Sequence, residues 1–244
     1  MVGSQHDLTT GGQAQGQTAN TDEVCVFCHT PHGSNTNATV PLWNKTLHAP
    51  GSFTRYSSLA IPSFDSAEAP VGSVSLACLS CHDGTQAMDV VINKPGSGGY
   101  NAAGSEIDPV AIEAMTGTPV PNLGTDLSND HPISMQYGGG GALVTDPDGQ
   151  FSGTLKDPDF VKPIKGTSNG QPVWWVDSPV GAANTREKTD MLLYARNDLG
   201  TVQPFVECGS CHDPHNSSTK GPTQVAFLRV TNTASRICTS CHIK

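Results

Sequence analysis

Four copies of one short pattern carry most of the chemistry available to this sequence. Each copy is a cysteine, two variable residues, a second cysteine and an immediately following histidine, and together they use every cysteine of the 244-residue chain. The eight cysteines are Cys25, Cys28, Cys78, Cys81, Cys208, Cys211, Cys238 and Cys241. Two thiols at this spacing form the attachment signature of c-type haem, in which both thiols bond to the porphyrin and the adjacent histidine ligates the iron. The pattern therefore predicts four covalently attached haems c. Their proximal iron ligands are His29, His82, His212 and His242.

Zinc sites and disulfides are the alternative uses of paired cysteines. A zinc ribbon places its two cysteine pairs about 15 to 20 residues apart, whereas 49 residues separate Cys28 from Cys78 and 26 separate Cys211 from Cys238. Neither alternative requires a histidine after every pair, and disulfide frameworks are typical of shorter chains. Covalent haem attachment therefore explains the pattern best.

The composition excludes several classes of protein. A net charge of −9, with no cluster of Lys and Arg, argues against nucleic-acid binding, and no apolar run is long enough to predict a membrane span. Glycine and proline are frequent, with 26 and 18 copies, and eight thioether bonds can cross-link a chain much as disulfides do. We therefore expect a mostly coil chain with few short helices and little strand, a multihaem cytochrome fold organised around four covalent haems.

One domain, residues 1–244, is expected to hold all four haems. Their sites lie at 25–29, 78–82, 208–212 and 238–242, and the long haem-free segment 83–207 is expected to wrap around them. Thr185–Asn197 is the best candidate for a longer helix. Trp174 and Trp175 are expected to pack on a haem edge or on each other.

Five histidines remain for the sixth coordination positions of the four irons, namely His6, His32, His48, His131 and His215. Every iron can therefore carry two imidazoles. An enzyme that acts on a substrate at haem needs an open iron, so this count favours electron transfer over catalysis. Methionine as an axial ligand is not needed.

Two of these histidines lie three residues beyond a proximal ligand, each directly after a proline. They are His32, in His29-Thr-Pro-His32, and His215, in His212-Asp-Pro-His215. Three residues span at most about 10 Å, too little to wrap around the porphyrin edge, so each should ligate a different haem. Such a short tether would hold two porphyrins close enough for electrons to pass between them. The alternative is a surface histidine in a turn.

The other distal positions are less constrained by spacing. His131 is the single histidine between residues 83 and 207 and is expected to be a distal ligand, with a surface histidine as the alternative. Spacing alone does not decide between His6 and His48 for the remaining position.

Several segments resemble extracellular multihaem cytochromes of the doubled-motif type, most closely the OmcE-like tetrahaem subunits of cytochrome nanowires. The segments are Ser4–Leu8, Val24–His32, Pro41–Lys45, Asn129–Ser134, Glu207–His215 and Ala226–Arg229. The resemblance implies that His6 is a distal ligand and that His48 has no ligand role. It also implies that His32 ligates a haem of the adjacent subunit, so that the chain forms a homopolymer through an intersubunit His–haem bond. A monomer in which His32 serves an internal haem is the alternative.

We therefore expect an electron-transfer protein, the subunit of an extracellular conductive filament, that exchanges electrons with redox partner proteins or extracellular acceptors. Covalent attachment of haem takes place outside the cytoplasmic membrane. The sequence lacks the basic and apolar regions of a signal peptide, so it is expected to be the mature chain. An extracellular or cell-surface location follows, with the periplasm as the alternative. A monomeric periplasmic electron shuttle and a multihaem reductase are the alternative functions.

Overall fold

The computed structural model describes residues 1–12, 14, 20–62, 64–96, 98–107, 114–115, 121–141, 154–216 and 227–243. The chain divides into two compact units. Unit 1 consists of Met1–Tyr56 and Val71–His131, and unit 2 consists of Ser57–Pro70 and Pro132–Lys244. Each unit contains two of the four cysteine–histidine patterns, so that motif 1 (25–29) and motif 2 (78–82) belong to unit 1, and motif 3 (208–212) and motif 4 (238–242) to unit 2. The single tetrahaem domain stays a prediction.

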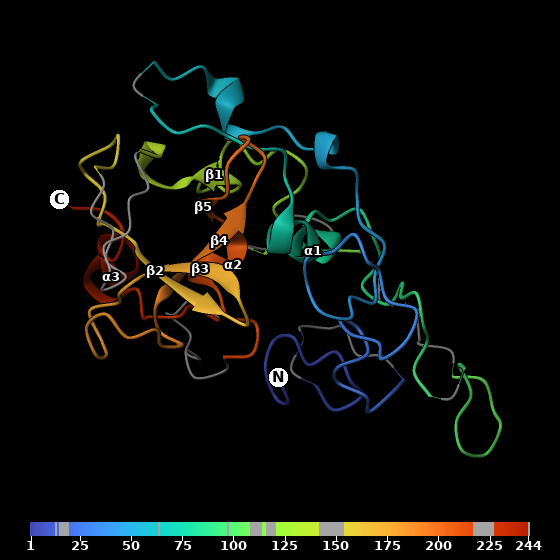
Figure 1. Cartoon of the computed structure of the whole chain (residues 1–244). Coiled ribbons are helices and arrows are strands. Elements are labelled where there is room, and N and C mark those ends of the chain that lie inside the picture. The colour runs from blue at the N-terminus through green and yellow to red at the C-terminus, as the bar shows by residue number, and fades with distance from the viewer. Residues whose placement is uncertain are drawn as a thin grey trace. The chain divides into compact units, whose positions relative to one another are not determined.

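Unit 1 is built largely from turns. Its longest described helix is α1 (Ser73–His82), which is labelled in Figure 1. This helix begins after Gly72 and carries motif 2 at its C-terminal end. The Asp83 backbone N–H donates to Leu79 O at 3.1 Å and closes the helix. The short 3-10 helix η1 (Pro50–Ser52) follows motif 1 in unit 1, and η2 (Tyr56–Leu59) begins at the last residue of the segment Met1–Tyr56 and continues into unit 2. Among the described residues, no helix has the length and apolar character needed to cross a membrane.

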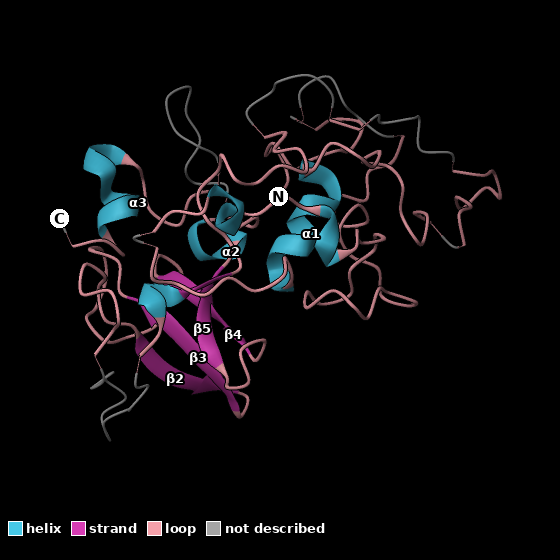
Figure 2. Cartoon of the chain, turned by 90° about the horizontal axis from the view of Figure 1, so that it is seen from above, coloured by secondary structure: helices cyan, strands magenta, loops and turns pink. Residues whose placement is uncertain are grey.

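Unit 2 contains a five-stranded antiparallel sheet with the strand order β1-β5-β4-β3-β2, drawn in magenta in Figure 2. The strands are β1 (Met135–Gln136), β2 (Ile164–Ser168), β3 (Gln171–Val176), β4 (Met191–Arg196) and β5 (Gln203–Val206). The short 3-10 helix η3 (Tyr137–Gly139) lies between β1 and β2 in sequence, and η4 (Thr233–Ser235) follows α2. Helix α2 (Cys208–Cys211) carries motif 3 directly after β5 and contacts β4, while α3 (Arg236–Thr239) begins motif 4.

The sheet overturns the expectation of a mostly coil chain with little strand. One overlooked signal is Asn169-Gly170, whose φ angles of 50° and 75° form a two-residue loop between the paired residues Ser168 and Gln171. Such a dipeptide between two extended runs is the strongest short-range signal for a hairpin. The expectation of little strand rests on the thioether cross-links, which can hold a chain together without a sheet but do not prevent one from forming.

The helix expected over Thr185–Asn197 is also wrong, because β4 lies there. Methionine and leucine have high intrinsic helix propensities. In the structure, however, Met191 and Leu193 are buried on one face of β4, and Leu192 between them is only half-buried. This alternation matches strand periodicity. Pairing of Leu192 with Trp175 of β3 therefore outweighs local propensity.

Each unit has an apolar cluster that includes cysteines of its motifs. In unit 1 a small cluster of Leu8, Val26, Phe27 and Met88 packs against Cys28 and Cys81. In unit 2 the buried members are Tyr137, Leu155, Trp174, Val176, Met191, Leu193 and Val230. Ile237 and Cys241 pack against this second cluster, so the sheet positions motif 4.

Candidate haem centres

The cysteine–histidine patterns fold as single helical turns. The histidine backbone N–H donates to the carbonyl of the first cysteine in motif 1 (2.8 Å), motif 3 (3.0 Å) and motif 4 (3.0 Å), and motif 2 ends α1. Positions three and four residues apart share one face of a helical turn. The two thiols and the histidine of each motif therefore project to the same side, and all eight cysteines are free thiols.

Two proximal histidines are oriented through their Nδ1 atoms. His29 Nδ1–H donates to Pro41 O at 2.7 Å, and His82 Nδ1–H donates to Pro121 O at 2.8 Å. A carbonyl can only accept, so the proton lies on Nδ1 and the Nε2 lone pair remains for a metal. Burial lowers the pKa of His82, against the opposing effects of the Pro121 hydrogen bond and Asp83. The neutral imidazole that results is the form that ligates iron.

A returning backbone segment fixes motif 1. Thr30 N donates to Leu42 O at 2.8 Å and Asn44 N to Cys28 O at 2.9 Å. Leu42 has a φ of 57°, which turns the chain so that the preceding Pro41 carbonyl reaches His29. The Asn44 side chain then donates to the carbonyl of Val26, inside motif 1, at 2.6 Å.

Motif 3 is fixed by the same device. Asp213 N donates to Phe227 O at 2.8 Å and Arg229 N to Cys211 O at 2.9 Å. Phe227 has a φ of 65°, and the Arg229 side chain donates through Nε to Gly209 O, inside motif 3, at 3.0 Å. Of the run Ala226–Arg229, Ala226 lies outside the described residues. Units 1 and 2 thus repeat one construction, which sequence analysis missed because the returning segments share little sequence.

The second cysteines of the two motifs in each unit lie within electrostatic range of each other, and in unit 1 both pack against the same apolar cluster. Burial, reinforced by the Cys81 thiol, raises the pKa of Cys28 to about 12. In unit 2 burial, reinforced by the Cys211 thiol, raises the pKa of Cys241 to about 12. A free thiol is already mostly protonated at neutral pH, and these shifts suppress the thiolate further. The structure therefore brings motif 1 to motif 2, and motif 3 to motif 4.

Buried cations lie beside these cysteine pairs, and sequence analysis also missed them. The Lys45 side chain is fully buried and donates to Val90 O at 2.8 Å and Ala87 O at 3.3 Å. Its charge opposes the rise in the pKa of Cys28 and Cys81. In unit 2 Arg229 acts in the same sense on the pKa of Cys211, which burial nevertheless raises to about 11.

His6 lies opposite a proximal ligand. Its ring centroid is 6.0 Å from that of His82, with an angle of 57° between the ring planes. Two imidazoles bound to opposite sides of one metal ion, through bonds of about 2.0 Å, have their ring centres roughly 6 Å apart. The structure therefore brings together the pair that would enclose the iron of motif 2.

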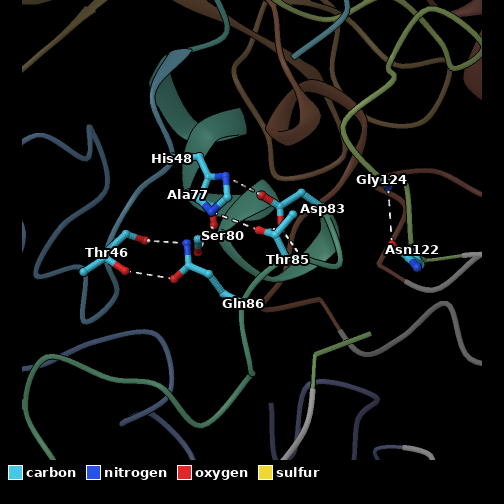
Figure 3. Close-up of polar contacts among 9 residues, drawn as sticks. All are labelled: Thr46, His48, Ala77, Ser80, Asp83, Thr85, Gln86, Asn122 and Gly124. Atoms are coloured by element: carbon cyan, nitrogen blue, oxygen red, sulfur yellow. Dashed lines mark hydrogen bonds and ion pairs between the residues drawn. The ribbon is translucent and has the colours of Figure 1, made fainter. Parts of the chain in front are cut away.

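His48 is held by protein groups instead (Figure 3). Its Nε2 is 2.9 Å from Thr85 Oγ1 and its Nδ1 is 3.5 Å from Asp83 Oδ2. The neighbouring Thr46 hydroxyl donates to Gln86 Oε1 at 2.9 Å. Of the two histidines that spacing could not separate, His6 has the better geometry for a ligand.

His32, His131 and His215 are exposed. His215 Nδ1 lies 3.7 Å from Asp213 Oδ1. Unit 2 contains His212, His215 and His242 and no other histidine, so it has one candidate distal ligand for two motifs. The ligand roles of these exposed histidines stay predictions.

Two buried tryptophan N–H groups near the motifs test whether a haem fits these sites, because each lacks an acceptor that a haem could provide. Trp43 Nε1 and Trp174 Nε1 are buried without a hydrogen-bond partner in the described structure. The Trp43 ring packs edge-on against His29, with centroids 6.0 Å apart, and Trp174 belongs to the cluster that contacts Cys241. A haem carries carboxylate acceptors for such donors. By contrast, no three His, Cys, Asp or Glu side chains converge as a metal-ion site within the described ranges.

Residues 203–244, which include motifs 3 and 4, match the protein family described as the doubled CXXCH motif. A comparison with curated proteins found no match. The matched motif supports covalent binding of haem c and indicates a multihaem c-type cytochrome with an electron-transfer role.

Proposed function

We propose that this protein transfers electrons through four bis-histidine c-type haems, arranged as one pair in each unit. The observation that carries the proposal is the proximity of the second cysteines in each unit: Cys28 and Cys81 pack against one apolar cluster, and the Cys211 thiol lies near enough to Cys241 to raise its pKa. Two haems attached at neighbouring thiols lie close together, as electron transfer between them requires. Haem iron supplies the one-electron chemistry when bound.

The chain's own residues attach and orient the haems and close the iron coordination. The eight cysteines form the thioether bonds, and His29, His82, His212 and His242 are the proximal ligands. His6 faces His82 at a suitable distance and serves the haem of motif 2. His32, His131 and His215 are the remaining distal ligands. With both faces of each iron closed, no position remains for a substrate, which disfavours a reductase.

The histidine distribution favours a filament subunit over a monomer. Unit 2 has only His215 for two irons, so one of its haems needs a ligand from elsewhere. His32 is exposed, and His6 already faces His82. As the resemblance to filament cytochromes implies, His32 ligates a haem of the adjacent subunit and links the chains into a homopolymer at the cell surface or outside the cell. There it passes electrons to redox partner proteins or extracellular acceptors. A monomeric periplasmic shuttle remains the second candidate.

Electron microscopy and spectroscopy of the purified, haem-loaded protein test this function. We expect four haems per chain by pyridine haemochrome assay, low-spin spectra without carbon monoxide binding, and filaments. His32→Ala should abolish the filaments, whereas the matched change His48→Ala should not. A His32→Ala protein that keeps its filaments, or a wild-type protein that is monomeric with four low-spin haems, contradicts the filament and supports the shuttle. Carbon monoxide binding contradicts bis-histidine ligation.

A further inference from the structure

Arg229 is a buried cation without a carboxylate partner in the part of the chain that the structure describes. Only 8% of it is exposed. Its Nε donates to Gly209 O and its Nη1 to Lys188 O, both at 3.0 Å. The other strongly buried arginine of unit 2, Arg196, pairs with both Asp198 (2.9 Å) and Glu207 (2.7 Å). A buried charge is costly unless it is paired, so a bound anion would stabilise the guanidinium of Arg229.

Arg229 lines an opening together with two more cationic residues. The opening has a volume of about 270 Å³ and is lined by Arg186, Glu187, Lys188, Leu192 and Arg229. Arg186 and Lys188 are exposed and form no ion pair with other described residues. The Glu187 carboxylate instead accepts a hydrogen bond from Ala182 N at 3.3 Å.

Three cations around one opening are unusual in a chain with 13 Lys and Arg against 22 Asp and Glu. The planar guanidinium group suits a carboxylate, which it can bind through two parallel hydrogen bonds. The chemistry of the opening therefore matches a carboxylate better than any neutral ligand.

The opening lies beside a haem-attachment turn. Arg229 is bonded to motif 3 twice, through its backbone N–H to Cys211 O at 2.9 Å and through Nε to Gly209 O. A c-type haem keeps its two propionate carboxylates after attachment. We infer that Arg186, Lys188 and Arg229 form the binding site for a propionate of a haem attached in unit 2. This inference rests on the proposed function.

The site has a consequence for reduction potential. Cations near a haem disfavour the more positive ferric state, so they raise the potential. The exposed pair Arg186 and Lys188 can be changed together without disturbing the buried Arg229. The variant Arg186→Gln/Lys188→Gln removes two charges from the opening. The control Lys94→Gln/Lys156→Gln removes two charges from exposed ion pairs elsewhere.

Spectroelectrochemical titration of the full haem-loaded protein provides the test. We expect Arg186→Gln/Lys188→Gln to lower the midpoint potential of one haem, while the control leaves all potentials at the wild-type values. That haem should be one of those lost when the cysteines of motif 3 or motif 4 are replaced by alanine. Four haems per chain with no shift beyond the control overturn the inference alone. Failure of motifs 3 and 4 to attach haem overturns the proposed function as well.

Added inorganic phosphate separates a propionate from a free anion. At constant ionic strength, we expect the wild-type potentials to be independent of phosphate, because the covalently tethered carboxylate already fills the site. The contrary result is a midpoint potential that falls with phosphate in the wild type but does not change with phosphate in Arg186→Gln/Lys188→Gln. This result would show that the opening binds a free anion, and it would overturn the assignment to the propionate.

Discussion

Units 1 and 2 fix the first motif of each pair in the same way but support it with different frameworks. In both, a residue with positive φ, Leu42 or Phe227, turns a segment back onto the motif. In unit 1 the surrounding core is a small cluster joined to α1. In unit 2 it is a five-stranded sheet. The geometry for haem attachment is therefore local, and the framework around it is free to vary.

The buried cation shows a second difference between the units. Lys45 of unit 1 is fully enclosed and directs its ammonium to Val90 O and Ala87 O. Arg229 of unit 2 is bonded to the motif and also lines an opening. A lysine is a compact point charge, whereas an arginine has donors left for a further partner. Each unit thus buries one cation in its returning segment, but at different positions, because Arg229 is the counterpart of Asn44 and Lys45 is the residue after Asn44.

Removal of the cysteines of one motif should have the largest effect. Cys78→Ala/Cys81→Ala in unit 1 and Cys238→Ala/Cys241→Ala in unit 2 should each reduce the haem count from four to three, because both thioether bonds of one haem are lost. Intact mass and pyridine haemochrome assays measure the count, with Thr239→Ala as a control that keeps all thiols. A unit 1 variant that retains the wild-type count would contradict the equivalence of the two units.

Replacement of His6 should change the haem of motif 2 without removing it. His6→Ala takes away the imidazole that faces His82 at 6.0 Å, so about one quarter of the haem should become high-spin and bind carbon monoxide. His48→Ala serves as the matched control, since its ring nitrogens face Thr85 and Asp83. Optical and electron paramagnetic resonance spectra report the change. A spin change in His48→Ala but not in His6→Ala would show that His48, and not His6, is the distal ligand.

Sequence analysis predicted the chemistry of the site better than its framework. The cysteine and histidine spacing is covalent and local, so motifs such as Cys208–His212 are visible without a fold, and the structure shows three of them as closed helical turns. The sheet was missed because β4 contains strong helix formers and becomes a strand only through its pairing with β3. The buried position of Lys45 was equally invisible, because nothing next to it in sequence requires a lysine to be enclosed.

Loss of the Arg196 ion pair should destabilise unit 2 more than any comparable change in unit 1. The Arg196 and Glu207 side chains are 8% and 0% exposed, and Nη1 lies 2.7 Å from Oε1. Arg196→Met leaves the Glu207 carboxylate buried without a counter-charge, which costs about 3–5 kcal/mol. Glu207 also caps α2 with Ser210, so motif 3 should lose order first.

Thermal and urea denaturation of the haem-loaded protein measure this loss. Lys94→Met, which breaks an exposed ion pair of unit 1, should cost less than about 1 kcal/mol. The double variant Arg196→Met/Glu207→Gln should recover part of the stability, because the uncompensated charge is removed. Equal effects of Arg196→Met and Lys94→Met would show that the buried pair does not support unit 2.

The smallest effect tests whether the two returning turns are equivalent. Leu42 and Phe227 have φ angles of 57° and 65°, a conformation that costs an L-residue about 1–2 kcal/mol and glycine almost nothing. Glycine also has the greater entropy in the unfolded chain. We therefore expect Leu42→Gly to be more stable than Leu42→Ala by up to about 1 kcal/mol. Both variants remove the side chain beyond Cβ, so their difference isolates the backbone strain.

The same comparison at Phe227 should give the same difference, even though both Phe227 variants are destabilised by loss of a ring that is only 8% exposed. Urea denaturation curves with a common slope measure the four free energies of unfolding. If the glycine variant has a higher free energy of unfolding than the alanine variant in one unit only, the two turns are not equivalent in the haem-loaded protein. The two units would then share the cysteine–histidine motifs but not the strained turns that hold them.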